Sequence, residues 1–271
     1  MKKTFEYIGL FVFVIFSFYY TEKVVKLVND NDPLMEKISL YADETNRACV
    51  EGYTTEDGII LGVSGLIVDE DKSYSNMKGF GYSEELFVFE EDLCSVNKSE
   101  YIDEYIIKGN ESKNAISLLI LVDDAKLLSE INGIAKAKGV NFGYVVSGEV
   151  LKENKELFAK LLRDGNDILY GGTNEDDFEM FYKIINELGN DTYCIYNGHD
   201  VISYCSKENV NSVKTDFIYN KNVLLNIKST LEKGNIYIIK ENKFVIDELS
   251  STISHIDGKG INIYTLTNLL S

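Results

Sequence analysis

The sequence predicts an α/β fold built on a parallel β-sheet, and three observations lead to this prediction. From Asn114 onward, seven short apolar segments alternate with helical patterns. Segments such as Ile116–Val122 are apolar throughout, as in strands that are covered on both faces. Glycine follows several of the helical patterns, at the left-handed position that commonly ends a helix. The pattern leaves closure of the sheet into a barrel open.

The unit at the centre of the pattern is a strand, a helix and a second strand. Its first strand ends at Ser147-Gly148, an amphipathic segment follows, and Asp164-Gly165 ends that segment. The expected strands are Ala115–Val122, Val140–Val146, Asp167–Tyr170, Thr192–Tyr196, Ser212–Ile218, Asn235–Lys240 and Ile261–Leu266. The expected helices are Ala125–Lys138, Glu149–Arg163, Asp176–Leu188, Asp200–Lys207, Asn222–Lys233 and Asn242–Ile256.

The first residues of the chain predict a membrane anchor. Tyr7–Tyr20 is apolar, and Lys2 and Lys3 precede it. With its flanks, Thr4–Thr21 approaches the length of about 20 residues that a spanning helix needs. No small-residue cleavage site follows, so we expect an uncleaved signal anchor rather than a removed signal peptide or a buried core helix. The lysines then lie inside, and the main domain of this single-pass protein lies outside the cell membrane.

The next part of the chain has a different character. Asp32-Pro33 contains the only proline and marks the start of a helix. Short apolar runs among glycines and acidic residues follow and predict a small β-rich module. We therefore expect an anchor with a juxtamembrane helix at residues 1–29, a small α/β module at residues 30–113, and the main domain at residues 114–271.

Charge and cysteine content restrict the partners and the compartment. The net charge is −17, and no basic stripe exists to neutralise phosphates, so we expect no nucleic acid partner. The same charge disfavours adhesion to an anionic membrane surface, and its main effect is solubility. Four cysteines, Cys49, Cys94, Cys194 and Cys205, can pair in three ways in an exported chain. Free buried thiols are equally compatible with the sequence.

Three segments of the main domain resemble a known family. Phe142–Gly148 reads FGYVVSG, and Asp164–Gly171 reads DGNDILYG after an amphipathic helix. Lys233–Ile239 reads KGNIYII near the end of the chain. In this order and spacing they resemble the polysaccharide deacetylase family, the NodB-type homology domain of carbohydrate esterase family four. The resemblance covers residues 114–271 and implies a distorted (β/α)7 barrel, here preceded by the small β-rich module and the transmembrane helix.

The resemblance also implies a chemistry, from which this chain departs. The family removes acetyl groups from glycans with a divalent metal such as zinc, held by an Asp and two His, while a further Asp acts as base and a His as acid. In an ungapped alignment the two metal-binding His positions fall on Gly171 and Glu175, and the acid falls near Lys240. The chain contains only His199 and His255, so it cannot supply this set.

Asp123 and Asp124 are the first candidates for a remaining site. They end a strand at the face where barrel sites form, so either can be catalytic and Asp124 can bind a metal. The structural alternative is that both begin the next helix, where carboxylates suit the helix dipole.

Glu175 and His199 complete the candidates. Glu175, together with Asp176 and Asp177, can join the aspartates as an oxygen ligand of Mg²⁺ or Ca²⁺. The favoured structural alternative is the acidic first turn of a helix that Thr173 or Asn174 caps. His199 follows a strand and is the remaining catalytic candidate, although a lone loop histidine is more often solvated or hydrogen-bonded.

We therefore expect a membrane-anchored, extracytoplasmic, polysaccharide deacetylase-like protein that has lost its catalytic set and binds no cofactor. Its expected partner is peptidoglycan or another cell-wall glycan, or it acts as a scaffold for envelope proteins. The first alternative is an active deacetylase of N-acetylated cell-wall polysaccharide, with a non-standard zinc site built from Asp123, Asp124 and nearby carboxylates. The second is a protein-interaction module with a vestigial pocket.

Overall fold

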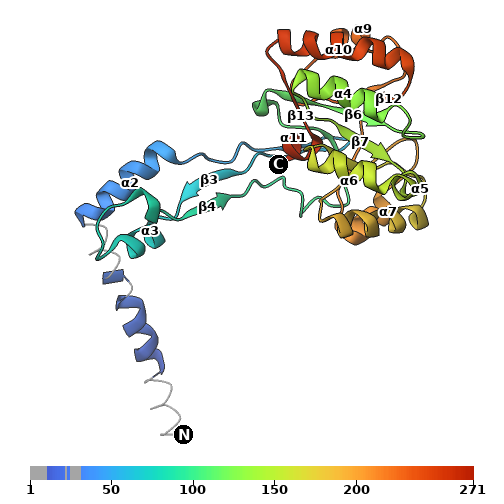
Figure 1. Ribbon diagram of the computed structural model, residues 1–271. Helices are drawn as coiled ribbons and strands as arrows, with labels where there is room; N and C mark the ends of the chain where they lie inside the picture. Colours follow the sequence, from blue (N-terminus) through green and yellow to red (C-terminus); the bar gives the residue numbers. More distant parts are fainter. Residues whose placement is uncertain (1–10, 22, 25–31) are drawn as a thin grey trace, which may run out of the picture. The chain divides into compact units, whose positions relative to one another are not determined.

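The computed structural model describes residues 11–21, 23–24 and 32–271 (Figure 1). These residues form two compact units. The smaller unit contains the described residues up to Cys49 together with Gly65–Asp92, and the larger unit contains Val50–Ser64 together with Leu93–Ser271. The segment expected as residues 30–113 is thus divided between the two units.

The larger unit contains a mainly parallel sheet, as the alternation of strands and helices predicted. Its order along the sheet is β1 (Tyr53–Thr54), β2 (Ile59–Ile60), β5 (Tyr105–Lys108), β10 (Ser212–Val213), β9 (Cys194–Ile195), β8 (Asp167–Tyr170), β7 (Gly143–Val146), β6 (Ala115–Leu121), β12 (Ile236–Lys240) and β11 (Ile218–Tyr219). A further strand, β13 (Asn262–Tyr264), pairs with β6. Only β1 runs antiparallel to its neighbour in this part of the structure.

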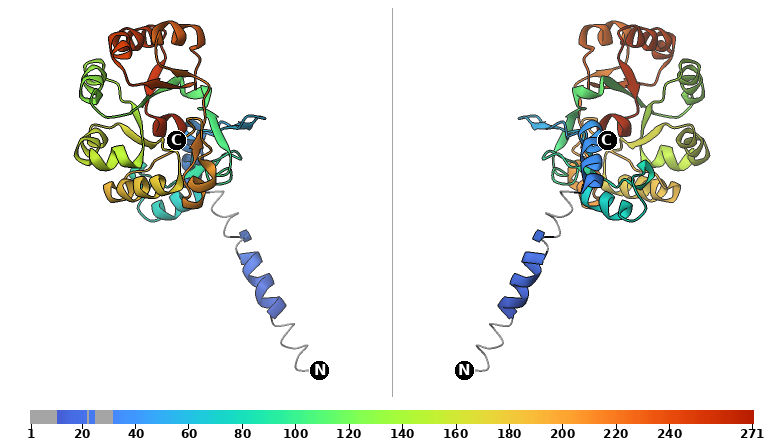
Figure 2. Two further views of the ribbon diagram at one scale, coloured as in Figure 1. Left: turned by 90° about the vertical axis from the view of Figure 1, so that its right-hand side faces the viewer. Right: turned by 90° about the vertical axis from the view of Figure 1, so that its left-hand side faces the viewer.

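Helices cover the outside of this curved sheet, and one short helix lies at its centre (Figure 2). The outer helices are α4 (Leu128–Lys138), α5 (Gly148–Glu153), α6 (Lys155–Arg163), α7 (Glu175–Leu188), α8 (Ile202–Cys205), α9 (Val223–Thr230) and α10 (Lys243–Gly258). The central helix is α11 (Leu266–Leu270), whose leucines pack with the inner face of the sheet.

Both faces of the strands are buried, which explains their unbroken apolar sequences. On β7, Tyr144 and Val146 belong to the cluster between the sheet and the outer helices. Val145, between them, belongs to the inner cluster together with Leu119 and Leu269. Because alternate side chains enter opposite clusters, neither face of the strand carries a polar row.

The sheet is an open half-barrel among the described strands, so the expected barrel is confirmed only in its coarser form. The expected strand Ser212–Ile218 is wrong in one respect, because it consists of two strands with different neighbours. β10 lies between β9 and β5, whereas β11 pairs with β12. The amide of Lys214 donates to the carbonyl of Ile106 at 2.9 Å, so β5 occupies the edge of β10 that β11 would need for closure.

Most other expected elements differ from the structure by a few residues at their ends, and two differ for an identifiable reason. The expected helix Glu149–Arg163 divides into α5 and α6 at Asn154. The expected strand Ile261–Leu266 ends at Tyr264, because Thr265 caps α11 through its side-chain oxygen.

The smaller unit is a small α/β module. It pairs β3 (Gly65–Val68) with β4 (Phe89–Asp92) in antiparallel fashion and packs α2 (Pro33–Thr45) on α3 (Glu70–Met77). Asp32 caps α2 by accepting a hydrogen bond from the amide of Leu34 at 2.8 Å, and Pro33 occupies the first turn, as the sequence predicted.

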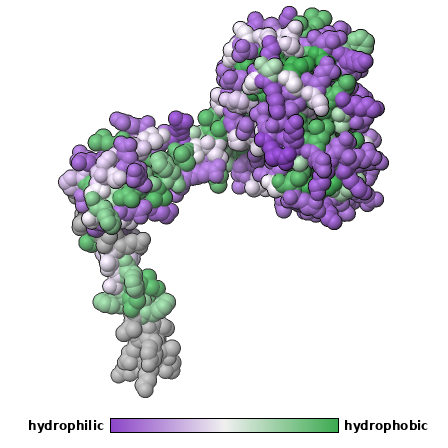
Figure 3. All heavy atoms as spheres, viewed as in Figure 1, coloured by the Kyte–Doolittle hydropathy of each residue, from purple (hydrophilic) through white to green (hydrophobic). Residues whose placement is uncertain are grey.

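Residues 11–21 are helical and exposed, and Phe13 and Phe18 are each 74% exposed. This segment is hydrophobic in the space-filling view (Figure 3). Among the described residues, no helix combines the length and the apolar character that a membrane crossing requires. The expected anchor begins within residues 1–10, which lie outside the described part.

Cys194 and Cys205 form a disulfide that joins β9 to α8. None of the four cysteines is a free thiol, so the structure decides between the two states that the sequence left open.

Candidate functional site

A cavity of about 320 Å³ lies at the carboxyl ends of β6, β7, β8 and β9, the end where sites form in barrels of this kind. We call it the carboxyl-end cavity. Leu121 and Val145 contribute apolar side chains, and Val145 also belongs to the inner core. Polar groups come from Asp123, Ser147, Glu149, Thr173, Asn174, Asp177 and Asn197.

Asp123 lines the cavity, but its carboxylate already has a cationic partner. Nζ of Lys240, the last residue of β12, lies 3.2 Å from Oδ2 of Asp123. This lysine stands near the position where the resemblance expected the acid histidine. Asp124 does not line the cavity and pairs with the neighbouring Lys126. Both aspartates are well exposed, with side-chain exposures of 60% and 51%.

The end of β8 carries Gly171, where the resemblance expected a metal-binding histidine, followed by Gly172. A Cβ atom on Gly171 would lie closer than 3.0 Å to Cγ1 of Val145. A Cβ atom on Gly172 would meet the carboxylate of Asp177 and the hydroxyl of Tyr170 just as closely. Both positions therefore accept only glycine in the present packing.

Glu175 begins α7 and points its carboxylate to another element. Nζ of Lys207 lies 2.5 Å from Oε1 of Glu175, and Glu175 does not line the cavity. The capping alternative is confirmed, since Oδ1 of Asn174 accepts a hydrogen bond from the amide of Asp177 at 3.0 Å.

Asp177 holds α5 against α7 at the rim of the cavity. The amides of Gly148 and Glu149, the first residues of α5, donate to its two carboxylate oxygens at 3.0 and 3.1 Å. A carboxylate is the group that the amino end of a helix favours. The chain's own side chain therefore fills the place that an anionic ligand would take.

Asn197 follows β9 and supplies the cavity's least satisfied polar atom. Its Nδ2 donates to the carbonyl of Gly171, while its Oδ1 is buried without a hydrogen-bond partner in the described structure. An unpaired buried oxygen costs about 1–3 kcal/mol, so a ligand that donates to it gains that energy. Asp177, a possible metal ligand on sequence grounds, accepts from the amides of α5 instead. The sequence did not single out Asn197, although it follows an expected strand and so lies where barrel sites form.

Glu241 supports the loop that carries the two aspartates. Its Oε1 accepts a hydrogen bond from the amide of Leu127 at 2.8 Å, and its Oε2 is buried without a partner. Burial is the main reason why the pKa of Glu241 lies above its ordinary value, and the nearby charges of Asp124 and Asp123 raise it further. Glu241 does not line the cavity.

The residues present do not fit the zinc ion that the resemblance implies. Asp123, Asp124, Glu175 and His199 belong to no described cluster in which three ligand atoms approach within 4.8 Å of one another. His199 is exposed and does not line the cavity. Of the four candidates, the structure therefore brings only Asp123 to the cavity, and there it contacts an ammonium group.

The comparison with solved structures shows several similar folds. The wild-type carbohydrate esterase family four pseudoenzyme BA3943 from Bacillus anthracis is 19% identical and covers 89% of this chain and 96% of its own, with a TM-score of 0.63. A mutant of that pseudoenzyme with restored enzymatic activity is 18% identical and covers 89% and 98%, with a TM-score of 0.64. PdaA from Bacillus subtilis, a family 4 carbohydrate esterase, is 14% identical and covers 64% and 86%, with a TM-score of 0.52.

A scan against protein-family models and a search of curated proteins each found no match. The likeness to BA3943 extends into the smaller unit, because 89% of the chain is more than the larger unit contains. The strand order, the open half-barrel and these similarities lead to one conclusion: the protein has the carbohydrate esterase family four fold of the polysaccharide deacetylases, as its motifs predicted.

Proposed function

We propose that this protein is a catalytically inactive polysaccharide deacetylase-like protein that binds cell-wall glycan outside the cell membrane. The observation that carries the proposal is the state of the carboxyl-end cavity. The cavity is retained, whereas the positions of the expected metal ligands hold Gly171, which has no donor, and Glu175, which pairs with Lys207. The similarity to a pseudoenzyme over most of the chain supports the same reading.

Glycan binding is supported by the chemistry of the cavity wall. Asn197 offers an unpaired oxygen, and Asp123 and Glu149 add acceptors near the apolar side chain of Leu121. Sugar hydroxyl groups are donors that match these acceptors, and the apolar face of a sugar ring can pack against Leu121. An anionic ligand suits the cavity less well, because Asp177 already occupies the amino end of α5.

The proposed location rests on two features. A disulfide such as Cys194–Cys205 persists in oxidising compartments and is rare in the cytosol. The exposed apolar side chains of residues 11–21 suit a lipid environment, which agrees with a single-pass anchor.

Retention of the purified chain on insoluble peptidoglycan tests the binding. We expect retention that Asn197→Ala weakens and that soluble chitooligosaccharides compete away. Asn141→Ala is the matched control, because it removes an exposed amide that precedes β7 in the same unit and lies outside the carboxyl-end cavity. Absence of retention, or equal retention of both variants, contradicts the proposed site.

Acetate release from acetylated chitooligosaccharides tests the inactivity. We expect none in the presence of Zn²⁺, Co²⁺ or Mn²⁺. Metal-dependent release that Asp124→Ala abolishes would refute the proposal and establish the alternative of a relocated metal site.

A further inference from the structure

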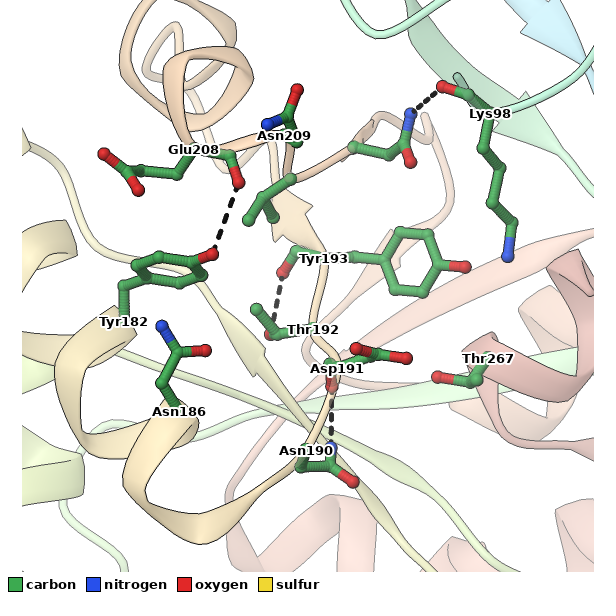
Figure 4. A pocket seen from close by; sticks show the side chains of 12 residues that line it. Lys98, Tyr182, Asn186, Asn190, Asp191, Thr192, Tyr193, Glu208, Asn209 and Thr267 are labelled. Carbon is green, nitrogen blue, oxygen red and sulfur yellow. Dashed lines mark hydrogen bonds between the residues drawn. The ribbon is translucent and has the colours of Figure 1, made fainter.

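A second cavity, of about 250 Å³, lies at the opposite end of the sheet in the larger unit. We call it the amino-end pocket, because it borders the segments that lead into β9 and β10. The carboxyl-terminal part of α7 and the first turn of α11 complete it (Figure 4). It shares no lining residue with the carboxyl-end cavity, and the proposed glycan binding does not use it.

Lys98 supplies the positive charge of this pocket. Its side chain extends beside the ring of Tyr193, with Nζ 5.4 Å from the ring centroid (Figure 4). Its backbone carbonyl accepts a hydrogen bond from Nδ2 of Asn211 at 2.9 Å, which fixes the lysine at the pocket edge. Burial lowers the pKa of Lys98, although Asp191 and Asp167 favour its charged form.

The ammonium group of Lys98 has no close counter-ion. Among the described residues, no carboxylate oxygen lies within 4.0 Å of its Nζ. The carboxylate of Asp167 is engaged elsewhere and accepts a hydrogen bond from the amide of Thr267 at 2.8 Å. The nearby Lys113 differs, because its Nζ donates to the carbonyls of Asn268 and Ser271. Lys98 is thus a partly buried cation without a carboxylate in direct contact, and an anionic group of a ligand would stabilise it.

Negative groups line another part of the same pocket. Asp191 contributes a carboxylate that makes no ion pair of 4.0 Å or less in the described structure, and Glu208 adds a further negative charge at the edge. The carboxylate of Asp191 points into the pocket, toward Thr267 (Figure 4). A ligand with several negative charges would be repelled by these groups, whereas an ammonium group would be attracted. The amides of Asn186 and Asn209 add uncharged donors and acceptors.

We propose that the amino-end pocket binds a small zwitterion of the α-amino acid type, with its carboxylate on Lys98 and its ammonium group on Asp191. Tyr193 forms a wall beside the carboxylate, and the asparagine amides select for polar over bulky apolar side chains. The size agrees with a small ligand, because pockets for drug-sized molecules begin at about 300 Å³. Free amino acids and short peptides both carry a carboxylate and an ammonium group in one small molecule, so either can be the ligand.

Calorimetric titration of the full-length chain tests the proposal with four probes. We expect binding of L-alanine and no binding of L-alaninamide, which lacks the carboxylate, or of N-acetyl-L-alanine, which lacks the ammonium group. The dipeptide L-alanyl-L-alanine distinguishes the two sources. If the dipeptide binds more tightly than alanine, the ligand is a short peptide; if it binds more weakly, the ligand is a free amino acid. Both results support a zwitterion-binding pocket.

Substitutions locate the binding. Lys98→Met should weaken it by about tenfold or more, since a hydrogen bond to a charged group is lost. Lys214→Met is the matched control, because Nζ of Lys214 lies at the same 5.4 Å from the ring of Tyr196 but outside the pocket. Absence of binding by both zwitterions, equal binding of N-acetyl-L-alanine, or unchanged binding by the Lys98→Met variant overturns the proposal. Glycan retention on peptidoglycan is measured on the same variants, and we expect it to stay unchanged.

Discussion

Removal of the Asp177 carboxylate should destabilise the larger unit more than its surface position suggests. Asp177 accepts two hydrogen bonds, from the amides of Gly148 and Glu149, and so connects the first turn of α7 with the first turn of α5. Each hydrogen bond to a charged group contributes about 1.5–3 kcal/mol. Water replaces part of this in a half-buried position, so we expect Asp177→Ala to lower the free energy of unfolding by about 2–4 kcal/mol.

Asp176→Ala is the control for this variant. Asp176 lies next to Asp177 in the first turn of α7, is exposed, and makes no hydrogen bond or ion pair in the described structure. Both variants lose the same favourable interaction with the helix dipole, about 0.3–1 kcal/mol. The difference between the two variants therefore isolates the connection to α5.

Urea unfolding followed by near-ultraviolet circular dichroism provides the measurement. The chain contains no tryptophan, so tyrosines report on tertiary structure, and Tyr170 packs against Phe178 of α7 with ring centroids 5.1 Å apart. We expect the midpoint of Asp177→Ala to fall well below that of Asp176→Ala, with Asp177→Asn between them because its amide keeps one acceptor. Equal midpoints of the two alanine variants would refute the reasoning.

Three further predictions concern the same unit. Gly171→His should lower the melting temperature in differential scanning calorimetry, because the new Cβ overlaps Cγ1 of Val145 and overpacking costs about 1–3 kcal/mol. Adding Val145→Ala should recover part of this loss, and no recovery would contradict the steric explanation. Replacing Cys194 and Cys205 by serine should lower the free energy of unfolding in urea by about 2–4 kcal/mol, because the disulfide also closes a loop of sequence separation 11 in the unfolded chain. Equal unfolding midpoints of the wild type and the variant would contradict this contribution. Burial raises the pKa of Glu241, so its ionised form is less favourable in the folded protein than in the unfolded chain, and the free energy of unfolding should fall as the pH rises from about 4.3 through the folded pKa. The Glu241→Gln variant should not show this fall, and identical pH profiles of the two proteins would contradict a raised pKa of Glu241.

The sequence predicted those parts of the fold that depend on local pattern. Unbroken apolar strands require cover on both faces, and the helices around β7 and the leucines of α11 provide it. Helix ends were predicted by the same means, because a glycine at positive φ follows α4 and α7 at Gly139 and Gly189.

Pairing between distant segments could not be predicted in this way. β5 pairs with β10 across about a hundred residues of chain, and no local pattern at Tyr105–Lys108 records that partner. The split of the expected strand Ser212–Ile218 follows from the same pairing, since β10 and β11 each take the neighbour that space allows. Local propensity sets whether a segment is extended, and tertiary context sets its partner.

In the candidate site, too, the sequence predicted the position of residues but not their contacts with distant parts of the chain. The motifs located the cavity, because the ends of β6 and β8 are where Asp123 and Gly171 stand. They did not reveal the contacts of these residues. The pairing of Asp123 with Lys240 and the hydrogen bond from Asn197 to Gly171 both join residues far apart in the sequence.

These contacts determine how many substitutions the chain would need to gain a metal-binding site. BA3943, a protein of similar fold, is a pseudoenzyme of which a mutant with restored enzymatic activity exists. At the two positions where the resemblance expected histidines, a histidine at position 171 requires Val145 to move, and one at position 175 gives up the ion pair of Glu175 with Lys207. Asp123 would also have to leave Lys240 before it could face a cation. Each step costs stability before a complete ligand set exists to stabilise a bound metal, so single substitutions should lower stability without producing metal affinity. Recovery of metal binding in this chain should therefore need a combined change at positions 145, 171, 175 and 240.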